Sequence, residues 1–370
     1  MPRIIDLCAG IGGMRKGFEL TGHFENVLSA ETDKFACMTY EHLYGNNPLN
    51  DITTEEFKQL AEQTEYEILL AGFPCQTFSR AGLQEGFNNE ERGVIFNHIV
   101  EIIQRTRPQG FFLENVDHLI THNQGETFQH IIDALEIDLN YKVIGVNRDE
   151  NNNLIYDTHT FIRNSRYFGV PQNRPRAYIM GFDREHFNDA DEIQDFLPQG
   201  RDEILYASLT PLLERRVDYK YYMSQGYYDT LVAHRARQAR NGNGFGFKVI
   251  NAKGIENPVA NTLLATGGSG KERNLVRDTS RRPVGRMVGS KTTPINDQYI
   301  RVLTPTEWGK LQGFINYAFI NTDGDDEFDF PEGISDAQKY KQFGNSVTIP
   351  VIESMAGFMV ECLRFLGVRI

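Results

Sequence analysis

Short apolar runs alternate with helix-periodic segments over roughly the first half of the chain. The runs that predict buried strands are Ile4–Leu7, Val27–Ala30, Ile68–Phe73, Phe111–Leu113, Val143–Val146 and Ala177–Gly181. Between them, Asn97–Arg105 and Thr127–Leu135 carry apolar residues at helical spacing. This alternation predicts an α/β fold with a doubly wound, mostly parallel sheet.

The pattern changes from about Asp183, where tyrosines, arginines and glycines become frequent. The glycines of Gly242–Phe247 and the short β-type runs Lys248–Ile250 and Thr262–Leu264 predict a smaller, loop-rich β domain. The chain ends in a predicted helix, Ile349–Leu366. We therefore expect a large domain made of residues 1–185 and a return at 331–370, with a smaller domain at 186–330.

The charge of the chain is unevenly distributed. The 370 residues are 40% hydrophobic and carry a net charge of −12, yet residues 201–300 hold 16 Lys/Arg against 9 Asp/Glu. That segment is thus at +7, which leaves −19 for the rest. A basic segment in an acidic protein is the footprint of a surface that docks phosphates. A slightly basic, solvated domain explains the same count equally well.

Apolar runs and cysteines restrict the cellular setting. The runs stop far short of the roughly 20 residues that span a bilayer, and the N-terminus has no secretory apolar region. Cys8, Cys37, Cys75 and Cys362 form no CxxC pair and are too few for a disulfide scaffold. We therefore expect free thiols in a reducing cytoplasm and no membrane segment. Since His and Cys also lack the spacing of zinc ligands, we expect no metal.

Cys75 and Glu114 each follow a predicted strand. Cys75 stands in Phe73-Pro-Cys-Gln after one apolar run, and Glu114 begins Glu114-Asn-Val after the next. The carboxyl ends of parallel strands share one sheet edge, where open α/β sheets bind ligands. A lone cysteine is usually a small buried hydrophobe. The matching carboxylate and a polar loop over Ser79–Arg92 favour a nucleophile beneath a lid instead.

A glycine-rich turn and two acids predict a nucleoside cofactor. Asp6-Leu-Cys-Ala-Gly-Ile-Gly-Gly13 follows the first strand, but its spacing is not that of a dinucleotide fingerprint. Glu31 ends the second strand, where an acid can accept hydrogen bonds from ribose hydroxyls. We expect Asp51 after the third strand, where it reads an adenine amino group. Each feature alone is equally well a tight turn or a helix cap; together they favour S-adenosylmethionine.

Two arginines on alternate residues stand in Gln172-Asn-Arg174-Pro-Arg176. Residues i and i+2 of an extended segment share a face, so both guanidinium groups are predicted to point at one carbonyl or carboxylate. Alone, such a pair is more often a solvated surface feature.

These residues resemble the DNA cytosine-5 methyltransferases, of the bacterial restriction-modification type. The resemblance rests on Phe73-Pro-Cys-Gln, Glu114-Asn-Val, the Gln172/Arg174/Arg176 pattern, Arg301-Val-Leu-Thr-Pro-Thr-Glu307 with Leu311-Gln-Gly-Phe314, and Phe343-Gly-Asn-Ser346, in the family's order. It covers nearly the whole chain. It implies a Rossmann-like, S-adenosylmethionine-dependent catalytic domain, a target-recognition domain, and a C-terminal helix packed near the glycine-rich turn.

The resemblance also implies roles for matching residues. Cys75 adds to C6 of a flipped cytosine, Glu114 contacts N3 and the amine, and Arg176, supported by Arg174, contacts O2. Ser79 and Arg92 in the lid, and Arg237, Arg240 and Arg273 in the recognition segment, contact DNA. The implied cofactor contacts are Asp6, Leu7, Cys8, Ala9, Gly10, Gly12, Gly13, Glu31, Thr32, Asp51, Ile52, Gly72, Pro74, Asn345 and Val347.

Two positions depart from the family pattern. Cys8 stands where an aromatic residue is usual, and Thr32 where a Trp usually follows the acid of the second strand. Those rings normally sandwich the cofactor's adenine, so we expect a pocket that is looser on both adenine faces. A catalytically weak DNA-binding relative is therefore one alternative. A tRNA cytosine-5 methyltransferase is another, disfavoured by the long basic region between Arg176 and Gly333.

The expected substrate is double-stranded DNA. Residues His234–Arg277 resemble recognition segments of bacterial relatives that act on palindromes beginning CC and ending GG, and arginines pair bidentately with guanine O6 and N7. The resemblance further implies a monomer in a prokaryotic cytoplasm, associated with the nucleoid through DNA, with a cognate restriction endonuclease as a possible companion.

Overall fold

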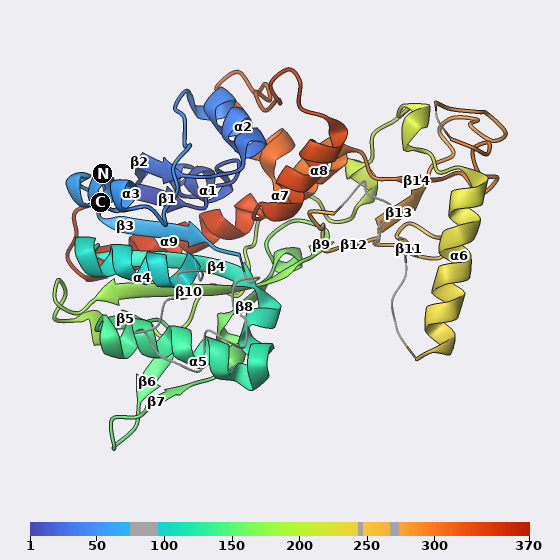
Figure 1. The fold of residues 1–370 in the computed structure, drawn as a ribbon. Coiled ribbons are helices and arrows are strands. Elements are labelled where there is room, and N and C mark those ends of the chain that lie inside the picture. The colour runs from blue at the N-terminus through green and yellow to red at the C-terminus, as the bar shows by residue number, and fades with distance from the viewer. Residues whose placement is uncertain (75–94, 243–246, 267–273, 290) are drawn as a thin grey trace. The chain divides into compact units, whose positions relative to one another are not determined.

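A computed structural model of the chain describes residues 1–74, 95–242, 247–266, 274–289 and 291–370 (Figure 1). These residues form two compact units. Unit 1 contains Met1–Tyr167, Pro175–Arg201 and Ile349–Ile370, and unit 2 contains Phe168–Arg174 and Asp202–Thr348. The borders thus fall at residues 201 and 349, where the sequence pattern placed them at 185 and 331.

The sheet of unit 1 is mixed. β2 (Glu25–Ala30), β1 (Arg3–Leu7), β3 (Ile68–Gly72) and β4 (Gly110–Val116) are parallel neighbours. β10 (Pro175–Asp183) follows and is antiparallel both to β4 and to its other neighbour, β5 (Tyr141–Val143). β8 (Ile162–Asn164) pairs with the other end of β10, and β6 (Val146–Arg148) pairs with β7 (Leu154–Tyr156). The predicted α/β fold with a parallel core is confirmed. The single strand predicted over Val143–Val146 is wrong, because Gly145, with φ of 90°, turns the chain between β5 and β6.

Helices cover both faces of this sheet. α3 (Glu55–Gln63), α4 (Ile95–Thr106) and α5 (Glu126–Asp133) bury their apolar faces in one core cluster with alternate strand residues such as Leu69 and Phe111. On the other face, Phe18 of α1 (Gly13–Glu19) contacts Phe112 with ring centroids 5.5 Å apart. α2 (Lys34–Tyr44) follows β2.

The C-terminal helix α9 (Ile349–Phe365) packs against α1. A Cβ at Gly17 would lie 2.6 Å from Ile352, so the two helices approach closely at that glycine. The prediction that this helix packs near the glycine-rich turn is therefore confirmed. Among the described residues, one helical stretch, Asp336–Phe365, is long and apolar enough to cross a membrane, and 78% of its apolar window is buried in the protein.

Unit 2 combines short strands with three helices in its described part. β11 (Lys248–Val249) and β14 (Ile300–Val302) flank β13 (Asn274–Arg277), and β9 (Gln172–Asn173) pairs with β12 (Ala260–Asn261). The helices are α6 (Gln225–Arg240), α7 (Pro305–Gln312) and α8 (Asp336–Asn345). The strand predicted at Thr262–Leu264 is wrong, since β12 ends at Asn261. α6 was not predicted because none of its residues is fully buried, which leaves no apolar period to detect.

A buried ion-pair network links β14 to α7 in unit 2. Arg301, which is fully buried, donates from Nε to Asp278 at 2.8 Å and from Nη2 to Glu307 at 2.7 Å. Glu307 also completes a capping box with Thr304 at the start of α7. Burial lowers the pKa of Arg301, but the hydrogen bonds and charges of Glu307 and Asp278 together outweigh it and raise that pKa above its usual range. The Arg301–Glu307 motif therefore has a structural role.

Candidate active site

Glu114 and Arg176 meet at the carboxyl end of β4. Pairing aligns Gly72 of β3 with Glu114, and Arg176 of β10 with Val116. Arg176 Nε lies 3.2 Å from Glu114 Oε1, with 10% and 12% of the two side chains exposed. A Cβ at Gly72 would lie 3.7 Å from Glu114 Oε2, so β3 passes close to the carboxylate. Two of the predicted reacting groups therefore share the sheet edge at which such folds bind ligands.

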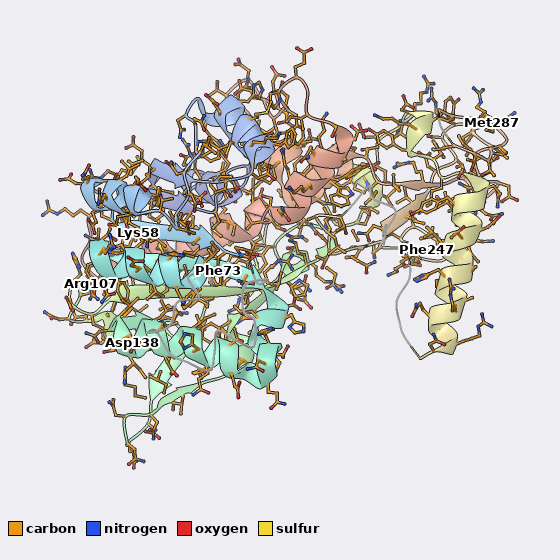
Figure 2. The ribbon with its side chains drawn as sticks, viewed as in Figure 1. Lys58, Phe73, Arg107, Asp138, Phe247 and Met287 are labelled. Atoms are coloured by element: carbon orange, nitrogen blue, oxygen red, sulfur yellow. The ribbon has the colours of Figure 1, made fainter. Side chains whose placement is uncertain are left out.

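Asn115 fixes the point at which the chain leaves β3. Its buried Nδ2 donates to the carbonyl of Phe73 at 2.9 Å, while its Oδ1 accepts from the N–H of Val116 at 2.8 Å. Phe73, labelled in Figure 2, packs its ring against Phe96. The exposed Pro74 follows. Cys75, Ser79 and Arg92 lie outside the described residues.

Arg174 and Arg176 do not share an acceptor, which corrects the prediction from their spacing. Arg176 contacts Glu114 and donates to the carbonyl of Pro175 at 2.7 Å. Arg174 is buried in unit 2. It donates to the carbonyls of Leu263 at 2.8 Å, Gly344 at 3.0 Å and Ser346 at 2.5 Å. The reason is that the two arginines lie on either side of a change of sheet: β9, which ends at Asn173, pairs with β12, whereas β10, which begins at Pro175, pairs with β4.

The glycine-rich turn after β1 has three residues in the left-handed region. Cys8, Gly10 and Gly12 have φ of 56°, 57° and 76°. Tyr44 of α2 donates its hydroxyl hydrogen to the carbonyl of Gly12 at 2.8 Å, and a Cβ at Gly12 would lie only 2.3 Å from its ring. Glycine at position 12 is therefore required both by its backbone angle and by the ring beside it.

Glu31 holds this turn through its carboxylate. Oε2 accepts from the N–H of Gly10 at 2.8 Å, and Oε1 accepts from the N–H groups of Thr32 and Asp33, both at 2.7 Å. Thr32 itself is exposed. The acid predicted to bind ribose thus also joins the loops that follow β1 and β2.

Asp51 does not follow the third strand, which corrects its predicted position. It is exposed in the loop between α2 and α3, where it accepts from the N–H and hydroxyl of Thr53 at 2.9 and 2.8 Å. That loop lies beside Glu31 all the same, because the Glu31 N–H donates to Pro48 and the Glu31 carbonyl accepts from Asn50. Folding of the loop, and not a strand, brings Asp51 to this edge.

The remaining predicted cofactor residues of unit 1 are mostly buried. Leu7, Ala9 and Ile52 have buried side chains, and Gly13 begins α1. Burial raises the pKa of the Asp6 carboxyl to about 7, against the hydrogen bond it accepts from the Arg15 N–H.

The three described thiols are held protonated. Burial, reinforced by the nearby Glu31 carboxylate, raises the pKa of Cys8 to about 12 and that of Cys37 to about 11. Burial likewise raises the pKa of Cys362 to about 12. Since the thiolate is the reactive form, none of these three is suited to nucleophilic attack at neutral pH.

A family model described as C-5 cytosine-specific DNA methylase matches residues 2–361. The chain belongs to this family. It is therefore a DNA cytosine-5 methyltransferase, as its motifs predicted.

Relatives of this methyltransferase agree along nearly its whole length. Type II methyltransferase M.HpaII of Haemophilus parainfluenzae is 39% identical over 364 residues, covering 97% of this chain and 89% of the relative. M1.ScrFI of Lactococcus lactis subsp. cremoris is 36% identical, covering 98% and 79%. The DNA-cytosine methyltransferase of Escherichia coli K12 is 33% identical, covering 96% and 76%. These relatives support sequence-specific methylation of cytosine C5.

Solved structures of methyltransferases share the fold. The S. pombe Dnmt2 methyltransferase superposes with a TM-score of 0.64 at 16% identity, with both chains fully covered. The Entamoeba histolytica methyltransferase EhMeth gives 0.64 at 15% identity, covering 98% of this chain and 99% of that one.

Unit 2 of the methyltransferase contains the other predicted binding residues. Asn345 is exposed at the end of α8, and Val347 is buried just after it. Arg237 and Arg240 are exposed on α6. Arg273 lies outside the described residues.

Two residues that position the site carry no signal of that role in the sequence. Asn115 stands within a family motif, but its bond to Phe73 depends on neighbouring strands that only the fold brings together. Tyr44 lies 32 residues from Gly12, and nothing in its local pattern marks it as a neighbour of the glycine-rich turn.

Proposed function

We propose that this enzyme methylates cytosine in duplex DNA by covalent catalysis, with Cys75 as nucleophile and Glu114 and Arg176 acting on the base. The observation that supports this proposal is the Glu114–Arg176 ion pair beside the end of β3, where Asn115 holds the Phe73 carbonyl two residues before Cys75. A cytosine beside this pair would meet a carboxylate for N3 and the amine and a guanidinium for O2.

The chemistry follows from these groups. The target cytosine leaves the duplex, at a cost of a few kcal/mol of unstacking and unpairing. The Cys75 thiolate forms a bond to C6, which makes C5 nucleophilic. Glu114 hydrogen-bonds N3 and the amine, and Arg176 stabilises charge at O2. After C5 takes the methyl group, a base removes the C5 proton and the C6–S bond breaks to release the thiolate. Arg174 acts in this scheme through the backbone carbonyls it holds.

The cofactor we propose is S-adenosylmethionine, which supplies a methyl group activated by a sulfonium. The donor chemistry of unit 1 fits it. Glu31 Oε2 accepts one amide of the described chain, that of Gly10, and each carboxylate oxygen has two lone pairs, so it can still accept a ribose hydroxyl. Among the described residues, no atom beyond its chain neighbours lies within 4 Å of where a Cβ would stand at the left-handed Gly10, so the backbone is open to a ligand at that residue. Asp6, Cys8, Asp51, Gly72 and Pro74 complete the proposed contacts in unit 1, and Asn345 and Val347 those in unit 2.

Target recognition is proposed for the His234–Arg277 segment. Arg237 and Arg240 are exposed on α6 and, with Arg273, are the proposed DNA contacts. The proposed target is a palindrome that begins CC and ends GG. The enzyme would then be found with DNA in a prokaryotic nucleoid, as a monomer, with or without a cognate endonuclease.

Trapping with a modified base tests the mechanism. Duplex DNA with 5-fluorocytosine at the target should form a stable adduct on Cys75, because fluorine at C5 cannot leave as a proton does. Cys75→Ser should abolish the adduct, whereas Cys8→Ser and Cys37→Ser should keep it. An adduct mapped by mass spectrometry to another cysteine, or none with the wild-type enzyme, would contradict the proposal.

Substrate assays separate the alternatives. Transfer of labelled methyl groups to duplex DNA and not to tRNA is the expected result; transfer to tRNA alone, or to neither, would favour the tRNA enzyme or the inactive relative. Bisulfite sequencing of DNA from a host that expresses the chain gives the target. Methylation confined to sites without a CC step would refute the target assignment and leave the reaction unaffected.

A further inference from the structure

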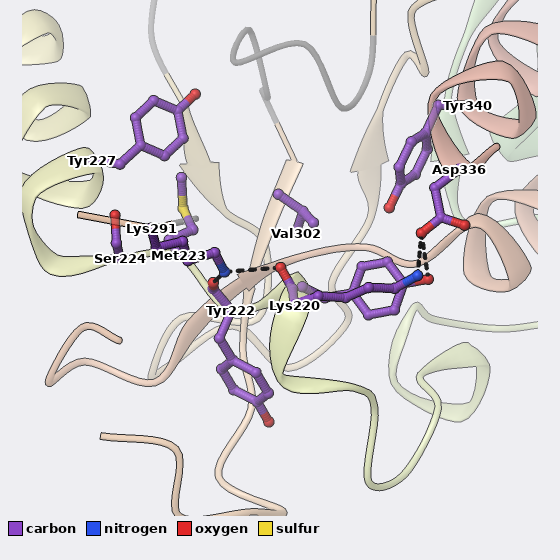
Figure 3. A pocket seen from close by; sticks show the side chains of 10 residues that line it. Lys220, Tyr222, Met223, Ser224, Tyr227, Lys291, Val302, Asp336 and Tyr340 are labelled. Atoms are coloured by element: carbon purple, nitrogen blue, oxygen red, sulfur yellow. Dashed lines mark hydrogen bonds and ion pairs between the residues drawn. The ribbon is translucent and has the colours of Figure 1, made fainter. Parts of the chain in front are cut away.

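A tyrosine-lined pocket lies within unit 2, and none of its lining residues belongs to unit 1. Its volume is about 370 Å³, within the range of small-ligand sites. Figure 3 shows Tyr227 of α6 and Tyr340 of α8 on opposite sides of Val302 of β14. Met223 and Val302 add apolar side chains, and Tyr221 adds a further aromatic residue to the lining.

Charged and polar side chains also line this mainly apolar pocket, among them Lys220, Asp336 and Ser224. Lys220 forms an ion pair with Asp336 at 2.6 Å, and its side chain is 53% exposed. Tyr221 donates to the same carboxylate at 3.0 Å. Ser224 is only 8% exposed at the N-terminus of α6, and its hydroxyl makes no capping bond to the helix.

A small anion does not suit this pocket. The first two amides of α6 are taken, because Gln225 N–H donates to the Pro294 carbonyl at 2.7 Å and Gly226 N–H donates to the Thr293 hydroxyl at 2.9 Å. Lys291 donates to the carbonyls of Lys220 and Tyr222. The Asp336 carboxylate at the edge would also repel an anion.

A metal ion does not suit it either, because Asp336 is the only His, Cys, Asp or Glu among its lining residues. Within the described ranges of the chain, no group of three such side chains is arranged to hold a metal.

A flat heterocycle does fit this combination of groups. Nucleobases stack on aromatic side chains whatever their sequence, and their edges require a few hydrogen-bond donors and acceptors. Ser224 offers both, and the Asp336 carboxylate can accept from an exocyclic amine. The region that contributes most of these residues is also the basic one, with 16 Lys/Arg against 9 Asp/Glu over residues 201–300.

We propose that the pocket formed by Met223, Ser224, Tyr227, Val302, Asp336 and Tyr340 binds one unstacked nucleobase, separately from the cytosine that is methylated. The base comes either from the DNA substrate or from a free nucleotide. The DNA source rests on the proposed function, whereas the nucleobase chemistry does not.

Photocrosslinking tests the proposal directly. The probes are a duplex with one 5-iodouracil in a single-nucleotide bulge, the same duplex fully paired, and 5-iodouridine monophosphate alone. The bulge lowers the cost of taking the base out of the helix. We expect mass spectrometry of the full-length protein to find the crosslink on Tyr227, Tyr340 or Met223. Crosslinking by the duplexes assigns the base to DNA, and crosslinking by the monophosphate alone assigns it to a free nucleotide.

Two variants and one control complete the test. Tyr227→Leu removes a stacking face, and Val302→Phe fills the pocket without removing a contact. Each should weaken binding of the crosslinking probe about tenfold, because one base–aromatic stack contributes about 1–3 kcal/mol. Tyr167→Leu, at a tyrosine 60% exposed in unit 1, should change nothing. Thermal melting confirms that each variant folds.

Two results would overturn the proposal. One is that the crosslinks map only outside the pocket with all three probes. The other is that the crosslinks persist unchanged in both folded variants. Methyl transfer by the wild-type enzyme is measured in parallel. Failure of methylation with the crosslink present would count against the proposed function, and failure of the crosslink with methylation present would count against the base pocket.

Discussion

Replacing Arg174 by lysine separates two roles for this residue. In the structure its guanidinium donates to three backbone carbonyls, those of Leu263, Gly344 and Ser346. Hydrogen bonds from a charged donor contribute about 1.5–3 kcal/mol each. Lysine keeps the charge but cannot reproduce the geometry of the planar fork. We expect one or two of the three bonds to be lost, and the free energy of unfolding of unit 2 to fall by about 2–4 kcal/mol.

Trp308 provides the assay, since it is the chain's single tryptophan and is buried in α7 of unit 2. Urea unfolding followed by its fluorescence should show the loss for Arg174→Lys and little change for Arg176→Lys. Methyl transfer under folding conditions should show the reverse, with the larger loss in Arg176→Lys. A stable Arg174→Lys enzyme that has lost methyl transfer would refute this reasoning and restore a direct contact between Arg174 and the base.

Three other predictions concern unit 1. Gly12→Ala should destabilise the protein by about 1–2 kcal/mol or more and weaken S-adenosylmethionine binding by calorimetry, because φ is 76° and the new Cβ would meet the Tyr44 ring; unchanged binding would argue against the turn as the cofactor site. Asn115→Ala should lower kcat about tenfold or more with little change in KM for the cofactor, because the Phe73 carbonyl is released; a changed cofactor KM with normal kcat would contradict it. Asp6 has a pKa raised by burial to about 7, so the folded state retains a proton that the unfolded state loses above about pH 4. The unfolding free energy should therefore fall between about pH 4 and pH 7, by up to about 1.4 kcal/mol per pH unit, and Asp6→Asn should flatten that slope; parallel slopes in urea titrations would disprove the shift.

The buried parallel strands and amphipathic helices were predictable from the sequence. β1, β3, β4 and β10 each contain a short apolar run, and α4 and α9 carry apolar residues at helical spacing. α6 could not be found in this way, because it packs only through partly buried residues such as Tyr228 and Leu231. With so few apolar residues on one side, its sequence shows no clear helical spacing of apolar positions.

The site was predictable where a residue's own strand positions it. Glu114 lies near the carboxyl end of β4, so the apolar run that precedes it is enough to place it at the sheet edge. Loop folding brings the Asp51 loop beside Glu31, and helix packing brings Tyr44 to Gly12, and neither leaves a periodic signal in the sequence.

Cys8 and Thr32 depart from the family pattern, and the backbone of the glycine-rich turn shows what these departures change. Its shape depends on Gly10 and Gly12 in the left-handed region and on the Glu31 carboxylate that accepts from Gly10 and Thr32. None of these features uses an aromatic ring at position 8 or 32. Losing the two rings should therefore cost stacking, about 0.5–1.5 kcal/mol for each aromatic pair, and leave the proposed hydrogen bond from the ribose to Glu31 possible. Weaker adenine binding is thus compatible with an intact Glu114–Arg176 pair, because strand pairing in the sheet, and not the glycine-rich turn, positions these two residues.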